Sequence, residues 1–114
     1  MKKENAQYLI ETFQPLYQRC KHFECGDGWF AIIKDLSDKL NYIINRDGLT
    51  IRATQVKQKF GTLRFYMDSE TDEMSRLIAK AEELSATTCE TCGLHGKMRE
   101  GWWKHVLCDE CAKN

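Results

Sequence analysis

The sequence predicts an α+β fold in which helices pack on a small antiparallel β-hairpin, followed by a cysteine-rich C-terminal module. Apolar residues recur at helical spacing in three segments within 1–86. A stretch rich in β-branched and aromatic residues, 49–67, separates the second segment from the third. Four cysteines gather in two pairs after residue 87. We therefore expect a globular domain over 1–86 with the order α–α–β–β–α, and a module of its own over 87–114.

The first segment predicts a helix over 5–13, a break before Pro15 and a further short helix to about His22. Proline lacks the N–H that a helix interior needs, so the pattern cannot run through it. The apolar positions that predict the first helix are Leu9, Ile10 and Phe13.

The next segment, 23–28, contains two glycines and predicts a turn. Asp27 is expected to cap the helix that follows, because its carboxylate can accept hydrogen bonds from the free N–H groups of a first turn. That helix is expected to end at Gly48. Its apolar stripe comprises Trp29, Ile32, Ile33, Leu36, Leu40, Ile43 and Ile44.

Strand-forming residues predict a hairpin with strands near 50–57 and 62–67 and a turn at Phe60 and Gly61. A third helix is expected to start at Ser69, with acidic residues in its first turn. Its stripe comprises Met74, Leu77, Ile78, Ala81 and Leu84. We expect one core to bury Ile33, Leu36, Phe65 and Leu77 together.

Composition favours an ordinary globular protein, with 42% hydrophobic and 30% charged residues and a net charge of zero. A neutral chain has no overall field to attract nucleic acid or an acidic membrane. The longest apolar run, 29–33, is too short to span a membrane. No apolar segment follows the basic N-terminal residues, so we expect no signal peptide and a cytoplasmic protein. Cysteines there serve as metal ligands or buried thiols more often than as disulfides.

The two C-x2-C pairs, Cys89 with Cys92 and Cys108 with Cys111, predict one structural Zn²⁺ ion. Each pair can direct two thiolates at one point, and four thiolates leave no coordination position for a catalytic water. A redox C-x2-C would open a helix in a βαβ unit, and neither pair has that context. A hairpin around Gly101 and a short helix at the second pair would complete a treble-clef-like module.

This module resembles GATA-type zinc fingers in its Cys-x2-Cys-Gly opening and its Leu-Cys-x2-Cys close. Those fingers read DNA with a helix and basic tail after the last pair, whereas only 112–114 follow here. Residues 87–114 also hold four basic and four acidic residues. With the zinc and its thiolates the module is negative, which opposes phosphate binding. The resemblance therefore implies a shared scaffold and not DNA reading.

A wider pattern resembles small phage and bacterial proteins that have no assigned activity. The matching segments begin with Gly26-Asp27-Gly28-Trp29, continue through the hairpin from Gln55 to Tyr66, and end with Cys89-Glu90-Thr91-Cys92-Gly93. The resemblance implies a phage or prophage setting. Small proteins of that kind often bind a host protein.

Other polar clusters have weaker signatures. Cys20, His22, Cys25 and Asp27 fall within eight residues and suggest a second metal site or a cysteine–histidine pair. The alternative is that the two thiols are buried as small apolar groups. Two further histidines, His95 and His105, lie inside the module but are not needed beside four cysteines. No combination of acid, base and nucleophile can be assembled, so we expect a protein that is not an enzyme.

Two surfaces are candidates for partners. Trp102 and Trp103 are adjacent strand residues, so at least one ring should face outward and favour a protein contact. Lys57, Lys59 and Arg64 lie beside Phe60 and Tyr66, a combination suited to nucleic acid. However, 46–64 holds five basic residues against one acidic residue, and 65–86 holds two against six. We expect the acidic third helix to neutralise the basic hairpin.

The preferred interpretation is therefore a non-catalytic, zinc-stabilised protein-binding module, with a phage-borne modulator or inhibitor of a host protein as the specific form. The alternative is a nucleic-acid-binding protein that uses the basic hairpin 52–64. No membrane partner is expected. The sequence indicates no oligomeric state.

Overall fold

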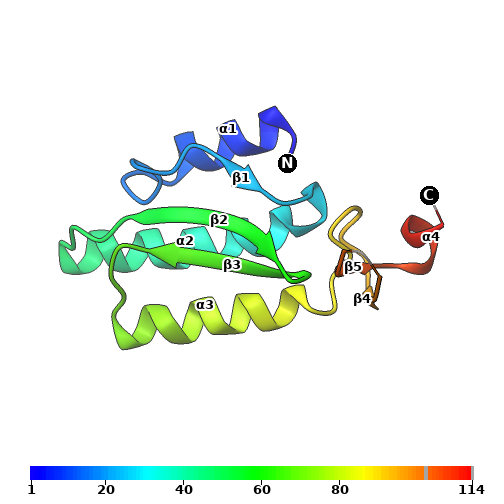
Figure 1. The fold of residues 1–114 in the computed structure, drawn as a ribbon. Coiled ribbons are helices and arrows are strands. Elements are labelled where there is room, and N and C mark those ends of the chain that lie inside the picture. The colour runs from blue at the N-terminus through cyan, green and yellow to red at the C-terminus, as the bar shows by residue number, and fades with distance from the viewer. Residues whose placement is uncertain (102, 114) are drawn as a thin grey trace.

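The α+β prediction is confirmed by a computed structural model, which describes residues 1–101 and 103–113. Figure 1 shows α2 behind a small sheet, α3 beside β3, and the cysteine-rich module at one end. The described elements are α1 Lys3–Thr12, β1 Phe23–Glu24, a 3-10 turn Asp27–Trp29, α2 Phe30–Asp47, β2 Ala53–Lys59, β3 Thr62–Met67, α3 Asp72–Ser85, β4 Lys97–Arg99, β5 His105–Leu107 and α4 Asp109–Ala112. None of the helices in this part of the chain combines the length and hydropathy of a membrane span.

The main sheet has three strands in the order β1-β2-β3, so the expected two-stranded hairpin is extended. β2 and β3 pair antiparallel, and their turn has positive φ at both Phe60 (+54°) and Gly61 (+90°), as a tight hairpin turn requires. β1 pairs parallel with β2 and comes from the segment that was predicted to be only a turn. A strand of two residues is too short to show an alternating pattern in the sequence.

Helix boundaries depart from the prediction at three places. The short helix expected before His22 is wrong, because 14–19 form hydrogen-bonded turns instead. α2 does end at Gly48 in the left-handed region, but Asp27 does not cap it. Its carboxylate accepts instead from the N–H of Lys2, just before α1, and from the Asn5 side chain on α1. α3 starts at Asp72, where the Thr71 hydroxyl accepts from the N–H of Met74, and not at Ser69.

The later start of α3 follows from the end of the sheet. The N–H of Asp68 donates to the carbonyl of Arg52, and the Asp68 carboxylate accepts from the N–H of Arg52, each at 3.0 Å. Asp68 is therefore still paired with Arg52 on the neighbouring segment. The helix begins only after this pair of hydrogen bonds, because residue 68 cannot adopt a helical position while it makes them.

The core lies between α2 and one face of the sheet. It buries Ile33, Leu36 and Phe65 as expected, but Leu77 is only half-buried and Leu84 is 53% exposed. The stripe predicted for α3 is therefore partly wrong. The helix buries Met74, Ile78, Ala81 and Ser85 instead.

This rotation of α3 has a polar cause. α3 lies along the free edge of β3, where the Ser85 hydroxyl accepts from the N–H of Leu63 at 2.9 Å and the Glu82 carboxylate accepts from the N–H of Phe65 at 3.0 Å. Strand edges leave N–H groups that must be paired or covered. The helix therefore presents polar side chains to the sheet, and part of its apolar stripe turns away from it.

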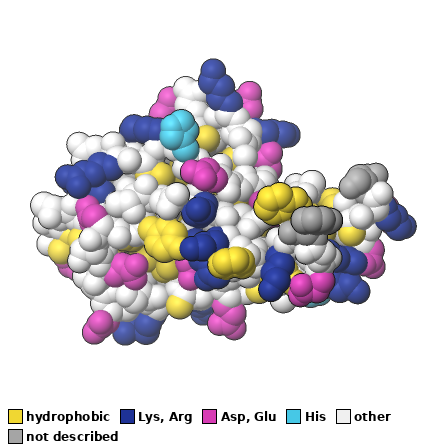
Figure 2. Space-filling view, in the orientation of Figure 1, with side chains coloured by type: hydrophobic (Ala, Val, Ile, Leu, Met, Phe, Trp, Pro, Cys, Tyr) yellow, Lys and Arg dark blue, Asp and Glu magenta, His cyan; other side chains and the backbone are white. Residues whose placement is uncertain are grey.

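The outer face of the hairpin is opposite α2. Lys57 stands beside Arg64 across β2 and β3, Lys59 beside Thr62, and Gln55 beside Tyr66. A bulge near Thr54 allows both Ala53 and Val56 to point into the core, which leaves this row pointing out. Figure 2 shows basic side chains gathered over β2 and β3, with hydrophobic side chains on both sides of them.

Candidate metal centre and the neighbouring basic face

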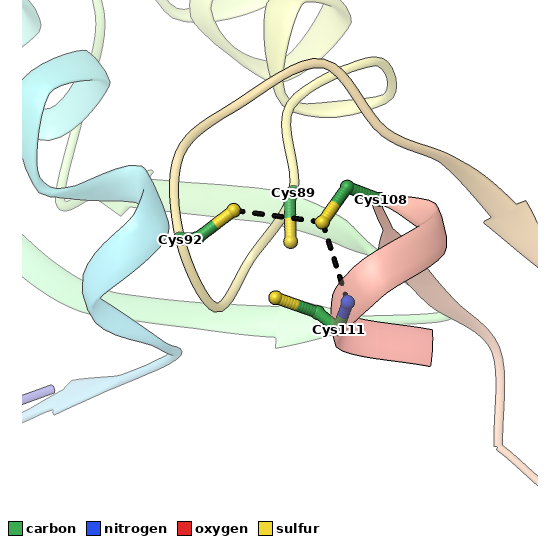
Figure 3. A group of neighbouring side chains, drawn as sticks. All are labelled: Cys89, Cys92, Cys108 and Cys111. Atoms are coloured by element: carbon green, nitrogen blue, oxygen red, sulfur yellow. Dashed lines mark hydrogen bonds between the residues drawn. The ribbon is translucent and has the colours of Figure 1, made fainter. Parts of the chain in front are cut away.

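The four predicted cysteines lie together, with all Sγ atoms within 4.8 Å of one another. Figure 3 shows their sulfur atoms converging from the loop after α3 and from the start of α4. Tetrahedral thiolates at the usual Zn–S length stand about 3.8 Å apart. The Sγ atoms of Cys92 and Cys108 are 3.6 Å apart, so the cluster fits one metal ion of this kind.

Short backbone contacts form the two halves of the cluster. The N–H of Gly93 donates to the carbonyl of Cys89 at 2.9 Å, and a φ of +84° at Gly93 closes this tight turn. On the other side, the N–H of Cys111 points at the Sγ of Cys108 at 3.4 Å. Between the halves, β4 and β5 form the expected hairpin. Its connection contains Trp102, which lies outside the described residues.

The thiols of the cluster differ in acidity. Burial alone would raise the pKa of Cys89, but the backbone N–H groups of Cys108, Cys92 and Thr91 outweigh it and lower the pKa to about 6. The hydrogen bond with Cys108 is the main cause that raises the pKa of Cys111 to about 12. Cys89 therefore loses its proton most readily. Four thiolates at this separation repel one another, so a cation must lie between them if all four are to be deprotonated.

The module is docked on the first domain through the segment 26–29. Glu90, between the first two cysteines, accepts from the N–H of Gly28 with its carbonyl at 2.7 Å and from the N–H of Gly26 with its carboxylate at 2.9 Å. The indole N–H of Trp29 donates to the carbonyl of Thr88 at 2.9 Å. Sequence reasoning took this segment as a turn and missed its role as the dock.

The two glycines of the dock are required by space. A Cβ atom at Gly28 would lie 2.1 Å from the carbonyl oxygen of Cys89, and one at Gly26 would lie 2.3 Å from that of Glu90. Neither glycine has a positive φ, so close approach and not backbone conformation is the reason. In the sequence, the signal for this contact was the pair of glycines before Trp29. Neither glycine is needed for a turn conformation, so their presence indicates that another part of the chain approaches closely.

A second contact joins the module to the hairpin turn. A Cβ atom at Gly61 would lie 2.6 Å from the Sδ of Met98 and 3.2 Å from the backbone carbon of Lys104. The segment before β5 therefore lies against the turn between β2 and β3. Trp103, next to Lys104, is 76% exposed.

The second cysteine group does not form a site. Cys20 and Cys25 are buried, and the Cys20 thiol donates to the backbone carbonyl of His22 at 3.5 Å and not to its ring. Burial, with the charge of Glu90, raises the pKa of Cys25 to about 12. In the described part of the chain, the four cysteines are the one group that could hold a metal ion, and neither His95 nor His105 belongs to it.

The acidic third helix forms no ion pair with the basic outer face in the described residues, contrary to expectation, although Glu24 of β1 stands in register with Lys57 in the sheet. Within 1–101 and 103–113, Lys57, Lys59 and Arg64 take part in no ion pair. Helix α3 lies at the sheet edge, where the Glu82 carboxylate accepts from the backbone N–H of Phe65 and pairs with none of these cations. The one pair between the two charged segments joins Arg46 to Glu73 at 2.9 Å, away from the strands.

The chain matches no protein-family model, no curated protein and no solved structure. Its function is therefore inferred from two features of its own structure. One is the cluster of metal ligands, and the other is the unpaired basic face beside it.

Proposed function

We propose that the protein is a non-catalytic, zinc-stabilised module that binds nucleic acid through the outer face of its hairpin. The observation that carries the proposal is the adjacent pair Lys57 and Arg64, which lies with Lys59 on one face. None of the three forms an ion pair among the described residues, although Glu24 of β1 is in register with Lys57. Cations arranged in this way can neutralise neighbouring phosphates. The expected neutralisation by the acidic third helix was an argument against nucleic acid, and no ion pair between that helix and these three cations supports it among the described residues.

The metal of the module is Zn²⁺. Four cysteines at tetrahedral spacing are the usual ligand set of structural zinc, and Cys92 and Cys108 stand at the separation that this geometry needs. The knuckle at Gly93, the hairpin β4–β5 and the helix α4 follow the order of a treble clef. Thiolate ligands must stay reduced, so the protein belongs in a reducing compartment such as the cytoplasm.

The zinc site has a structural role and no catalytic one. Four thiolates fill the tetrahedral shell, so no position is left for a water or a substrate. The module instead lies beside the binding surface, because Met98 and the backbone of Lys104 lie against the hairpin turn at Gly61.

Salt-dependent binding tests the proposed function. Fluorescence anisotropy of the zinc-loaded protein with a labelled oligonucleotide should show affinity that falls with salt. Neutralising three phosphates predicts a slope of log K against log salt of roughly −2 to −3. The triple alanine variant at Lys57, Lys59 and Arg64 should lose this binding. A matched triple at Lys39, Arg76 and Lys80, on α2 and α3, removes the same charge and should keep most of it.

Binding no tighter than about 10⁻⁴ M at physiological salt, or equal loss in both triple variants, would contradict nucleic-acid binding at this face. The first result would mean only weak non-specific attraction. The second would mean that overall charge, and not the arrangement on β2 and β3, is responsible.

A protein partner remains the second candidate because of a groove on the other side of the molecule. Leu77 and Leu84, which α3 turns away from the sheet, line an apolar groove of about 320 Å³ between α2 and α3. Exposed apolar grooves between helices are common protein-docking sites. A phage-borne modulator of a host protein would use this groove, and Leu84→Glu would then abolish capture of the host protein while leaving nucleic-acid binding unchanged.

A further inference from the structure

We infer that the ligand of the basic face is a single strand, whose bases stack on Tyr66 and Phe60 while its phosphates meet the cations between them. The inference rests on the proposed function and names the form of nucleic acid. It comes from the positions of the exposed aromatic rings and not from the charges.

The aromatic rings stand at the two ends of the cation row. Tyr66 is 40% exposed and lies two residues along β3 from Arg64, on the same face. Phe60 is 68% exposed in the turn at the other end. The Lys59 ammonium lies 5.7 Å from the centre of the Phe60 ring.

Phe60 has no structural reason to be aromatic. Its φ of +54° is costly for a bulky residue, and glycine or asparagine would suit the turn better. Among the described residues its ring is in no aromatic pair, and it contributes nothing to the buried core. A large ring held in solvent at a strained position beside a cation is typical of a functional site.

Rings of this kind distinguish single strands from duplexes. In a duplex the faces of the bases are covered by their neighbours, so an exposed ring on a sheet gains little from them. In a single strand the faces are free, and each base stacked on an aromatic side chain contributes about a tenfold gain in affinity.

The test compares a labelled single strand of 12 thymidines, its RNA equivalent of 12 uridines, and a 12-base-pair DNA duplex on the zinc-loaded protein. The double variant Phe60→Asn/Tyr66→Thr removes both rings and keeps residues suited to the turn and the strand. The control Tyr42→Leu removes a ring that is 65% exposed on α2. Circular dichroism and a thermal melt show whether each variant is folded.

We expect the wild type to bind at least one of the two single strands about tenfold or more tightly than the duplex. The double variant should weaken that binding by tenfold or more with little change in the salt slope, and the Tyr42 control should not weaken it. If one of the two single-stranded probes binds more tightly, that preference indicates whether the natural ligand is DNA or RNA.

The outcomes that overturn this inference differ from those that overturn the proposed function. Duplex binding equal to or tighter than strand binding, or a double variant that is folded and binds as the wild type does, refutes base stacking and leaves a basic face that binds nucleic acid. Failure to bind any of the three probes, or binding unaffected by the triple variant at the cations, refutes both. If the double variant does not fold, Phe60→Asn alone provides the same readout.

Discussion

The backbone N–H of Gly28 and the carbonyl oxygen of Glu90 are joined by a hydrogen bond of 2.7 Å. Glu90 stands between two of the metal ligands, and Gly28 lies in the 3-10 turn that precedes α2, so this bond ties the metal loop directly to the core domain. The carbonyl of Cys89 fills the space where a side chain of residue 28 would lie. The close approach of the metal loop to the core domain therefore requires that residue 28 has no Cβ atom.

Gly28→Ala should detach the metal loop from the core domain. The new methyl group would meet the Cys89 carbonyl oxygen at 2.1 Å, and overpacking of this kind costs about 1–3 kcal/mol of unfolding free energy. Thermal unfolding should show the loss, and hydrogen exchange should show faster exchange within 87–101. Gly48→Asn is the control, because residue 48 has a left-handed φ that asparagine tolerates and no atom within 4 Å of a Cβ. Unchanged exchange within 87–101 in Gly28→Ala would contradict the docking role.

Zinc stoichiometry is the second prediction. Native mass spectrometry should find one zinc per chain, and Cys92→Ser or Cys108→Ser should abolish it, because three thiolates hold the ion poorly. Cys20→Ala should retain the metal, since Cys20 is buried away from the cluster. A strong chelator should unfold 87–113 while α2 and α3 keep their exchange protection. A zinc content near zero, or a disulfide between the cysteines, would refute the metal assignment.

Local patterns in the sequence were sufficient for most of the fold. The spacing of Cys89, Cys92, Cys108 and Cys111 identified the metal cluster, because ligand geometry restricts that spacing. The stripe from Trp29 to Ile44 identified α2, and the alternation after Leu63 identified β3, because each element shows its own period in sequence.

Features set by tertiary contacts were not predictable in this way. β1 exists only because β2 offers it a partner, and α3 is rotated because Ser85 and Glu82 cover the edge of β3. The same rotation keeps the acidic helix off the basic face, so opposite charges that are close in sequence do not meet on it. A charge pattern fixes no orientation until the packing is known.

The third prediction is that truncation of Leu36 and of Leu77 lowers the unfolding free energy by different amounts. Leu36 is 2% exposed and belongs to the buried core, so Leu36→Ala should cost roughly 2–5 kcal/mol of unfolding free energy. Leu77 is half-buried at the groove, so Leu77→Ala should cost less than half as much as Leu36→Ala. Urea unfolding of both variants measures the difference. Equal losses would mean that the groove is closed by a partner or a second copy in solution.

The pH dependence of stability tests the contact between Asp27 and α1. Burial alone would raise the pKa of the Asp27 carboxyl, but hydrogen bonds from the N–H of Lys2 and the side chain of Asn5 lower it below its ordinary value of 3.8. Because the folded pKa is the lower one, the ionised carboxylate stabilises the fold. That contribution is complete above the unfolded pKa and is lost as the pH falls through the folded pKa.

Asp27→Asn should therefore destabilise the protein by about 1 kcal/mol at pH 7, and the difference from wild type should shrink as the pH falls below about 5. Urea unfolding of both proteins at pH 7, 5 and 4 measures this difference. Zinc release at low pH affects the variant and the wild type equally, so it does not contribute to the difference in their unfolding free energies. Asp38→Asn, an exposed carboxylate on α2, is the control and should show little difference at any of these values. A difference for Asp27→Asn that stayed constant with pH would show that the shape of the side chain, and not its charge, holds α1 to the dock.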